Sequence, residues 1–226
     1  MLNAFGLPMA ASAVARNEDE AAAIAAIFGF QIVLKLASPE ILHKTDANVV
    51  RLSLMTEKSV RAAFAEIARN AAAAVGQPLR PGAVGVLVQP MFTGVETLVG
   101  LTEDPNFGPL VAFGLGGVSV DVLHDVAFRI APLTDRDAEA LLRGVRGYQL
   151  LKGYRGRPAC DVEALREVLL RVSLIGQHIP EIVELDLNPV IALPDGHGCR
   201  IVDARARVAP YGRRGGAGSP RDTPLA

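Results

Sequence analysis

A strand pattern near the C-terminal end restricts the fold of this chain more than any other segment. In the run from Ile182 to Asn188, apolar residues alternate with Glu184, Asp186 and Asn188. A period of two places these three polar side chains on one face of a β-strand and the apolar side chains on the other. The turn signal PDGHG follows, and a second strand-like run comes after it. The pattern therefore predicts a β-hairpin with one apolar face and one face rich in side-chain oxygens.

The register of this hairpin predicts a metal site. If the turn centres on Asp195 and Gly196, Asn188 lies opposite Asp203, and cross-strand neighbours have Cβ atoms roughly 5 Å apart. Carboxylate and amide oxygens at that separation suit a hard cation such as Mg²⁺, which bridges phosphate groups. A polar sheet face turned to solvent has the same spacing, so the pattern alone leaves both interpretations open.

The remainder of the chain alternates between strands and helices, which predicts an α+β (α/β) protein with mixed sheets. Strands are expected at residues 30–36, 49–54, 84–89, 96–101, 109–113, 182–192 and 199–208. Helices are expected from the Asn17 cap to Phe28 and at residues 57–75, 135–144 and 162–177. The connector QPLRPG divides the chain into lobes of residues 1–83 and 84–209, and the Gly- and Pro-rich residues 210–226 are predicted to be disordered.

Two segments of the first lobe carry reactive or charged side chains. Lys35 lies near the end of an apolar strand, in a chain with four lysines and nineteen arginines. It is either a compact charge for phosphate oxygens or a lysine that extends from the strand to solvent. His43–Asp46 brings an imidazole, an ammonium, a hydroxyl and a carboxylate together on one loop. A histidine there acts as a nucleophile or base oriented by Asp46, or is simply solvated.

Two glycine-containing segments of the second lobe have weaker signals. The Gly114–Gly117 run permits the backbone to approach a ligand closely, although a tight turn explains it equally well. Arg155 stands between Gly153 and Gly156. It is either a contact for an anionic ligand or partner subunit, or an exposed loop arginine.

Composition excludes some classes of partner. The net charge is −1 and no basic stripe with interleaved aromatic residues occurs, which argues against nucleic acid. No apolar run reaches about 18 residues, so no membrane span is expected. Cys160 and Cys199 lack metal or redox spacing, and a reduced cytoplasm fits best.

Six ordered motifs resemble one family. They are VLKLASPEILHKTD, GVLVQPM, DPNFGPLVAFGLGG, DVAFRIAPL, LLKGYRG, and ELDLNPV followed by IVDAR. Together they resemble the ATP-grasp domain, or β subunit, of ADP-forming acyl-CoA (acetate–CoA) ligases, a family distantly similar to the β subunit of succinyl-CoA synthetase. The resemblance covers residues 1 to about 208. It implies an ATP-grasp fold, in which two lobes grip a nucleotide, and the reaction acyl-CoA + ADP + phosphate ⇌ acid + CoA + ATP.

The resemblance also implies roles for individual residues. Lys35 matches the phosphate-contacting lysine of the family, and Glu96 matches an acidic residue beside the nucleotide. Asn188 and Asp203, with Asp186 beside them, match the ligands of Mg²⁺. The hinge whose backbone reads the adenine of ATP or ADP corresponds to Val88, Gln89, Pro90 and Met91.

The catalytic loop is also implied by the resemblance. His43 matches the histidine thought to accept phosphate, and Asp46 belongs to the same motif. The chain has no CoA-binding domain and no candidate for a second phosphate-carrying histidine. The resemblance therefore implies a CoA-binding α subunit, or its fused equivalent, in a hetero-oligomer that handles acyl-CoA and acid through that partner.

Two departures from the family pattern support an alternative. The family usually continues its histidine motif with a hydrophobic residue and two glycines, whereas this chain has Ala47, Asn48 and Val49. Asparagine tolerates a positive φ, but β-branched valine does not. Asp121 also stands where the family usually has glutamate. The alternative is a binding or regulatory module that keeps the fold but has lost phosphoryl transfer.

Overall fold

The computed structural model describes residues 1–37, 48–75, 85–116 and 125–210, and these form two compact units. The small unit is Ala10–Phe92, and the large unit combines Met1–Met9 with Thr93–Ala226. The sequence placed the boundary near residue 83. It lies instead after Phe92, because β4 (Gly85–Pro90) pairs with strands of the first half of the chain.

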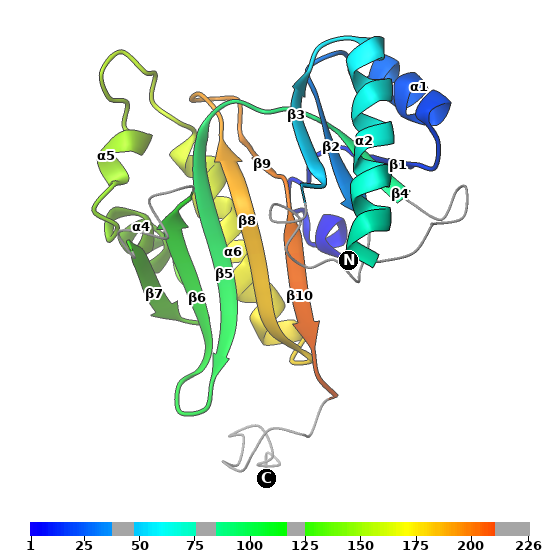
Figure 1. Ribbon diagram of the computed structural model, residues 1–226. Coiled ribbons are helices and arrows are strands. Elements are labelled where there is room, and N and C mark those ends of the chain that lie inside the picture. Colours follow the sequence, from blue (N-terminus) through cyan, green and yellow to red (C-terminus); the bar gives the residue numbers. More distant parts are fainter. Residues whose placement is uncertain (38–47, 76–84, 117–124, 211–226) are drawn as a thin grey trace. The chain divides into compact units, whose positions relative to one another are not determined.

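The small unit is a four-stranded sheet with two helices on one face. The strand order is β1 (Ala13–Ala15), β4, β2 (Ile32–Ala37) and β3 (Val50–Leu54). The helices α1 (Glu18–Phe28) and α2 (Glu57–Val75) pack against each other and against this sheet (Figure 1). Alternate residues of β2 enter their shared core, namely Ile32, Leu34 and Leu36. Lys35 therefore belongs to the opposite face of the sheet.

The first helix begins and ends as its sequence predicts. The Asn17 side chain accepts a hydrogen bond of 2.8 Å from the Glu20 amide, and three acidic residues occupy the first turn. These residues satisfy a free amide and complement the positive end of the helix dipole. The helix ends at Gly29, whose φ is 79°. The predicted bounds of α2 are also correct, but β1 was not predicted.

The large unit is a six-stranded sheet. Five strands follow the order β10 (Ala204–Val208), β8 (Ile182–Ala192), β5 (Val95–Asp104), β6 (Gly108–Leu115) and β7 (Val126–Ile130), and β9 (Cys199–Ile201) pairs with β8. Every paired strand in the described parts of both units is antiparallel. The prediction of mixed sheets was wrong in this respect, because the strands are joined mainly by hairpins and long returns rather than by parallel crossovers.

Helices cover one face of the large sheet. The helices are α4 (Asp135–Arg143), α5 (Tyr148–Leu151) and α6 (Val162–His178), and α4 and α6 pack on the sheet (Figure 1). Val99, Leu101, Phe113, Leu185 and Leu187 form the sheet side of this core and are almost fully buried. The short helix η1 (Leu2–Phe5) precedes Leu7, which joins the same core.

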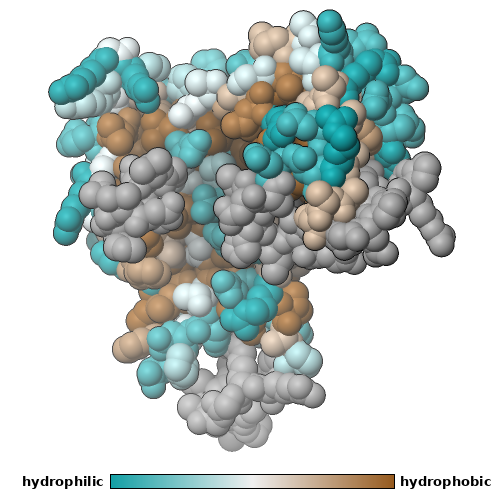
Figure 2. Space-filling model, viewed as in Figure 1, coloured by the Kyte–Doolittle hydropathy of each residue, from teal (hydrophilic) through white to brown (hydrophobic). Residues whose placement is uncertain are grey.

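The other face of this sheet carries polar side chains along β8 and β10. Glu184 and Asn188 of β8 and Arg205 and Arg207 of β10 are exposed. Figure 2 shows hydrophilic residues interspersed with hydrophobic ones toward the lower end of the sheet. No helix among the described residues is long and apolar enough to cross a bilayer.

Candidate functional site

The C-terminal hairpin has the register that the sequence predicts. Val190 pairs with Ile201 and Leu187 pairs with Ala204. Between these pairs, the Asn188 amide donates a hydrogen bond of 3.2 Å to the Asp203 carbonyl. The backbone therefore places the two residues opposite each other. The predicted second strand is interrupted at Val202 and Asp203, where the Asp203 side chain accepts a hydrogen bond of 3.0 Å from the Ala204 amide.

Three carboxylates act on one another along this face. Burial raises the pKa of the Asp186 carboxyl, Arg205 opposes the rise, and the charges of Asp203 and Glu184 add to it. Arg207 pairs with Glu184 at 2.9 Å, so Glu184 is partly neutralised. Asp186 and Asp203 carry the negative charge beside Asn188, and a bound cation would relieve their repulsion.

These donors fit Mg²⁺ better than a metal that needs a full protein cage. No group of three His, Cys, Asp or Glu side chains suited to a metal occurs among the described residues. Mg²⁺ keeps several waters and usually takes only one or two protein carboxylates together with phosphate oxygens. Asp203, Asp186 and the Asn188 amide satisfy that requirement, although their metal role stays a prediction.

Lys35 lies inside β2 rather than at its end. It pairs with Leu87 of β4 and Val50 of β3, and its side chain is half-buried. The neighbouring Leu34 and Leu36 are buried under the helices, so Lys35 shares its sheet face with Val33 and Gln89. The position places the Lys35 side chain on that face.

The predicted hinge segment, residues 88–91, forms backbone hydrogen bonds with β2 along one of its edges. The Met91 amide donates a hydrogen bond of 2.8 Å to the Gln31 carbonyl. Because hydrogen-bonding pairs alternate along an antiparallel ladder, Gln89 also directs its backbone groups toward β2. The Pro90 carbonyl then points to the other edge, where the last pair with β1 is Ala13–Val88.

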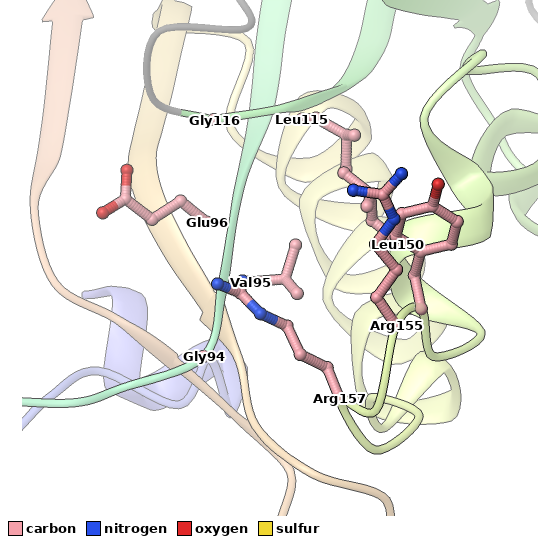
Figure 3. Close-up of a pocket in the computed structure, with 9 residues that line it drawn as sticks. Gly94, Val95, Glu96, Leu115, Gly116, Leu150, Arg155 and Arg157 are labelled. Carbon is pink, nitrogen blue, oxygen red and sulfur yellow. The ribbon is translucent and has the colours of Figure 1, made fainter.

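A pocket of about 520 Å³ lies at the start of β5 in the large unit. Its lining comes from three places: Gly94, Val95 and Glu96 of the β5 start, Leu115 and Gly116 at the end of β6, and Leu150, Tyr154, Arg155 and Arg157 from α5 and the loop after it. Figure 3 shows Arg155 and Arg157 coming from one loop, with Arg157 extending toward Val95 and Arg155 toward Leu115, while the Glu96 carboxylate projects from the opposite side of β5. A Cβ atom on Gly116 would lie 2.9 Å from the Glu96 Cβ, so this wall needs bare backbone.

Sequence reasoning found only part of this pocket. It named Glu96 and considered Arg155, but it missed Arg157, Tyr154 and Leu150 because no pattern links them to β5. It also missed Asp125, whose two carboxylate oxygens accept the Arg146 and Gly147 amides at 2.8 Å each. Asp125 thereby fixes the turn that leads into α5.

The Asn48–Val49 departure is accommodated by the backbone. Asn48 adopts the left-handed conformation, with φ of 55°, and its carbonyl accepts hydrogen bonds of 2.9 Å from both Arg51 and Asn70. Val49 does not share that conformation. It is fully buried in the small-unit core, and its carbonyl accepts the Leu36 amide at 3.0 Å. Asparagine therefore takes the conformation that glycine favours, and valine serves packing.

Some predicted residues lie outside the described parts of the chain. They are His43, Asp46, Asp121, Gly117 and the tail beyond Pro210.

Comparison with known proteins decides the family. A family model described as an ATP-grasp domain matches residues 1–208.

This chain belongs to the ATP-grasp domain family.

Curated relatives cover nearly all of this ATP-grasp domain. The β subunit of ADP-forming acetate–CoA ligase II from Pyrococcus furiosus is 41% identical over 209 residues, which are 91% of this chain and 86% of that protein. ADP-forming acetate–CoA ligase I from Archaeoglobus fulgidus is 43% identical over 206 residues. The match spans 91% of this chain but only 29% of that longer relative.

Solved structures agree with this assignment. An acetyl-coenzyme A synthetase 1 from Candidatus Korarchaeum cryptofilum, in complex with coenzyme A and Ca-AMPCP, has a TM-score of 0.85 and 42% identity. The match covers 92% of this ATP-grasp domain and 89% of that chain. A second complex of the same synthetase holds Mg-AMPPCP, with its phosphohistidine segment pointing towards the nucleotide binding site; its TM-score is 0.78 at 40% identity.

Proposed function

We propose that this chain is the nucleotide-binding subunit of an ADP-forming acyl-CoA synthetase. The observation that carries the proposal is the match to free-standing β subunits across almost the full length of both chains. In the proposed reaction, phosphate moves between ATP/ADP and a phosphohistidine, so that acid + CoA + ATP is interconverted with acyl-CoA + ADP + phosphate.

Each described residue of the site has a proposed task. Lys35 binds a phosphate oxygen of the nucleotide, and Glu96 is the acidic residue beside the nucleotide. The Pro90 carbonyl is the backbone acceptor of the hinge that best suits an adenine amino group, since Gln89 and Met91 are directed toward β2. Asn188 and Asp203, assisted by Asp186, would hold Mg²⁺. When bound, this ion would neutralise negative charge on the phosphate groups during phosphoryl transfer.

His43 and Asp46 are the proposed catalytic pair. His43 accepts the phosphoryl group, and Asp46 fixes the ring tautomer and stabilises the imidazolium that develops. A covalent phosphohistidine divides one transfer between distant sites into two short transfers. Because relatives that match along most of their length are named β subunits, we infer a CoA-binding α subunit as partner, in a cytoplasmic hetero-oligomer.

The conformation at Asn48 supports the enzyme over the degenerate module. The module was inferred from the missing glycine pair, but Asn48 takes the left-handed conformation and Val49 does not need it. Two relatives that the match covers to 86% and 87% of their own length are named ligase β subunits.

The test is phosphate labelling of the complex. We would co-purify the chain with its native partner and add ATP labelled at the γ-phosphate. Acid-labile, base-stable label should appear on this chain and disappear in His43→Asn, while the control His178→Asn, which changes an exposed histidine at the end of α6, keeps it. Label that is found solely on the partner would contradict the acceptor role. Acyl-CoA formation by the isolated chain would contradict the need for a partner.

A further inference from the structure

The loop after α5 has a conformation that is specified in detail. Gly153, Arg155 and Gly156 have φ values of 91°, 49° and 82°, and a left-handed arginine costs about 1–2 kcal/mol. The Arg157 amide donates a hydrogen bond of 3.1 Å to the Tyr154 carbonyl. A Cβ atom on Gly153 would approach the Arg157 carbonyl to 2.9 Å. The loop is therefore a tight turn that fixes the backbone from which the Arg155 and Arg157 side chains extend, Arg155 toward Leu115 and Arg157 toward Val95 (Figure 3).

These two arginines differ from four other arginines of the large unit. Arg143, Arg166, Arg171 and Arg207 each pair with a carboxylate. Within the described ranges, neither Arg155 nor Arg157 forms an ion pair. The Arg155 guanidinium lies 5.3 Å from the centre of the Tyr154 ring, a contact that leaves its N–H groups available at the edge.

Both side chains line the 520 Å³ pocket at the start of β5. Glu96 is the carboxylate among the described lining residues, and in Figure 3 it projects from the far side of β5. Two guanidinium groups therefore line one cavity, and no other carboxylate belongs to its lining among the residues that the structure describes. One planar guanidinium group can donate two parallel hydrogen bonds to a phosphate group, which an ammonium group cannot do.

The other lining residues indicate the chemistry of the part of the ligand that carries no phosphate. Leu115, Leu150, Val95 and the Tyr154 ring are apolar, and the volume exceeds what a single phosphate ion fills. We propose that this pocket binds the phosphate of an organic phosphate whose remaining part lies against these apolar residues, with Arg155 and Arg157 as the phosphate ligands. The choice of candidate ligands rests on the proposed function, which supplies two such compounds, the adenine nucleotide and CoA.

The test measures binding by calorimetry with the full chain. The probes are pyrophosphate, ATP, CoA and adenosine, and the variants are Arg155→Gln, Arg157→Gln and the double variant. The matched control is Arg146→Gln, an exposed arginine outside the pocket. Circular dichroism confirms that each variant is folded.

Each single substitution should weaken binding of pyrophosphate about tenfold to a hundredfold, the loss of one charge-assisted hydrogen bond. The effect should shrink in high salt. Adenosine affinity and the control should stay within about twofold. A loss for ATP but not CoA assigns the phosphate to the nucleotide, and a loss for CoA but not ATP assigns it to CoA.

Two results would overturn the proposal. One is a folded double variant that binds pyrophosphate, ATP and CoA as the wild type does, and the other is a wild-type chain that binds none of them. If the wild type binds pyrophosphate in an arginine-dependent manner but binds no ATP, the pocket stands and the proposed nucleotide function fails.

Discussion

Replacing Asn48 and Val49 with glycine tests the account of the Asn48–Val49 departure from the family pattern. The two positions should respond in opposite ways. Val49 is fully buried in the small-unit core, and burial of a valine side chain contributes about 1.5–3 kcal/mol. Glycine also costs about 0.5–1 kcal/mol in backbone entropy. Val49→Gly should therefore lose about 2–4 kcal/mol of unfolding free energy.

Asn48→Gly should change stability by less than about 1 kcal/mol. Glycine adopts the left-handed conformation without strain, and the hydrogen bonds from Arg51 and Asn70 go to the backbone carbonyl, so they survive the substitution. Asn48→Ala is the matched comparison and should cost about 1–2 kcal/mol, because alanine tolerates this conformation poorly.

Thermal melts followed by circular dichroism provide the measurement. For a chain of this size, 1 kcal/mol shifts the Tm by roughly 2–4 °C, so Val49→Gly should lower it by roughly 4–16 °C. The double variant with glycine at positions 48 and 49 should also show no increase in phosphate labelling of this chain in the complex with its partner. A Tm for Val49→Gly within about 2 °C of wild type, or increased labelling by the pair, would refute the reasoning.

Three other predictions concern the nucleotide site. Lys35→Ala should weaken ATP binding by about 1–3 kcal/mol with an unchanged circular dichroism spectrum, and equal affinity in calorimetry would reject the assignment. Asp186→Asn should raise the Tm at neutral pH, because burial raises the pKa of the Asp186 carboxyl in the folded chain. The contribution of this carboxyl to folding stability is fully present below the ordinary aspartate pKa and is lost as the pH rises through the raised pKa. The Tm difference between variant and wild type should therefore vanish in acid. A pH-independent difference would contradict this. Asp203→Ala should reduce the stabilisation of the chain by Mg²⁺ with ATP while leaving adenosine binding intact, and an equal loss for both would indicate general damage.

The sequence predicted the elements that have strong local signals. The α2 and β8 bounds were exact, and the Asn17 cap and Gly29 end defined α1. The elements it missed are short or weakly patterned. β1 has three residues, α5 has four, and β7 exposes Phe128 and Ile130, so no clear alternation of buried and exposed residues marked it.

The candidate site was predictable to the extent that it lies along one hairpin. Asn188 and Asp203 were placed opposite each other because turn position and a period of two fix an antiparallel register. The pocket with Arg155 and Arg157 joins α5 to the start of β5, and nothing in local sequence specifies that contact. The lobe boundary was misplaced for a similar reason, because the pairing of β4 with β1 and β2 is non-local.

The division of the chain into units has a consequence for its biosynthesis. The small unit is a continuous stretch, so it can fold as soon as residues 10–92 have left the ribosome. The large unit cannot, because Met9 bridges to Ile201 and the Ile201 amide donates to the Pro8 carbonyl. The first nine residues must therefore wait, with Leu7 unburied, until almost the whole chain is made. If translation stalls late, the nascent chain would carry a folded small unit between two unfolded segments of the large unit.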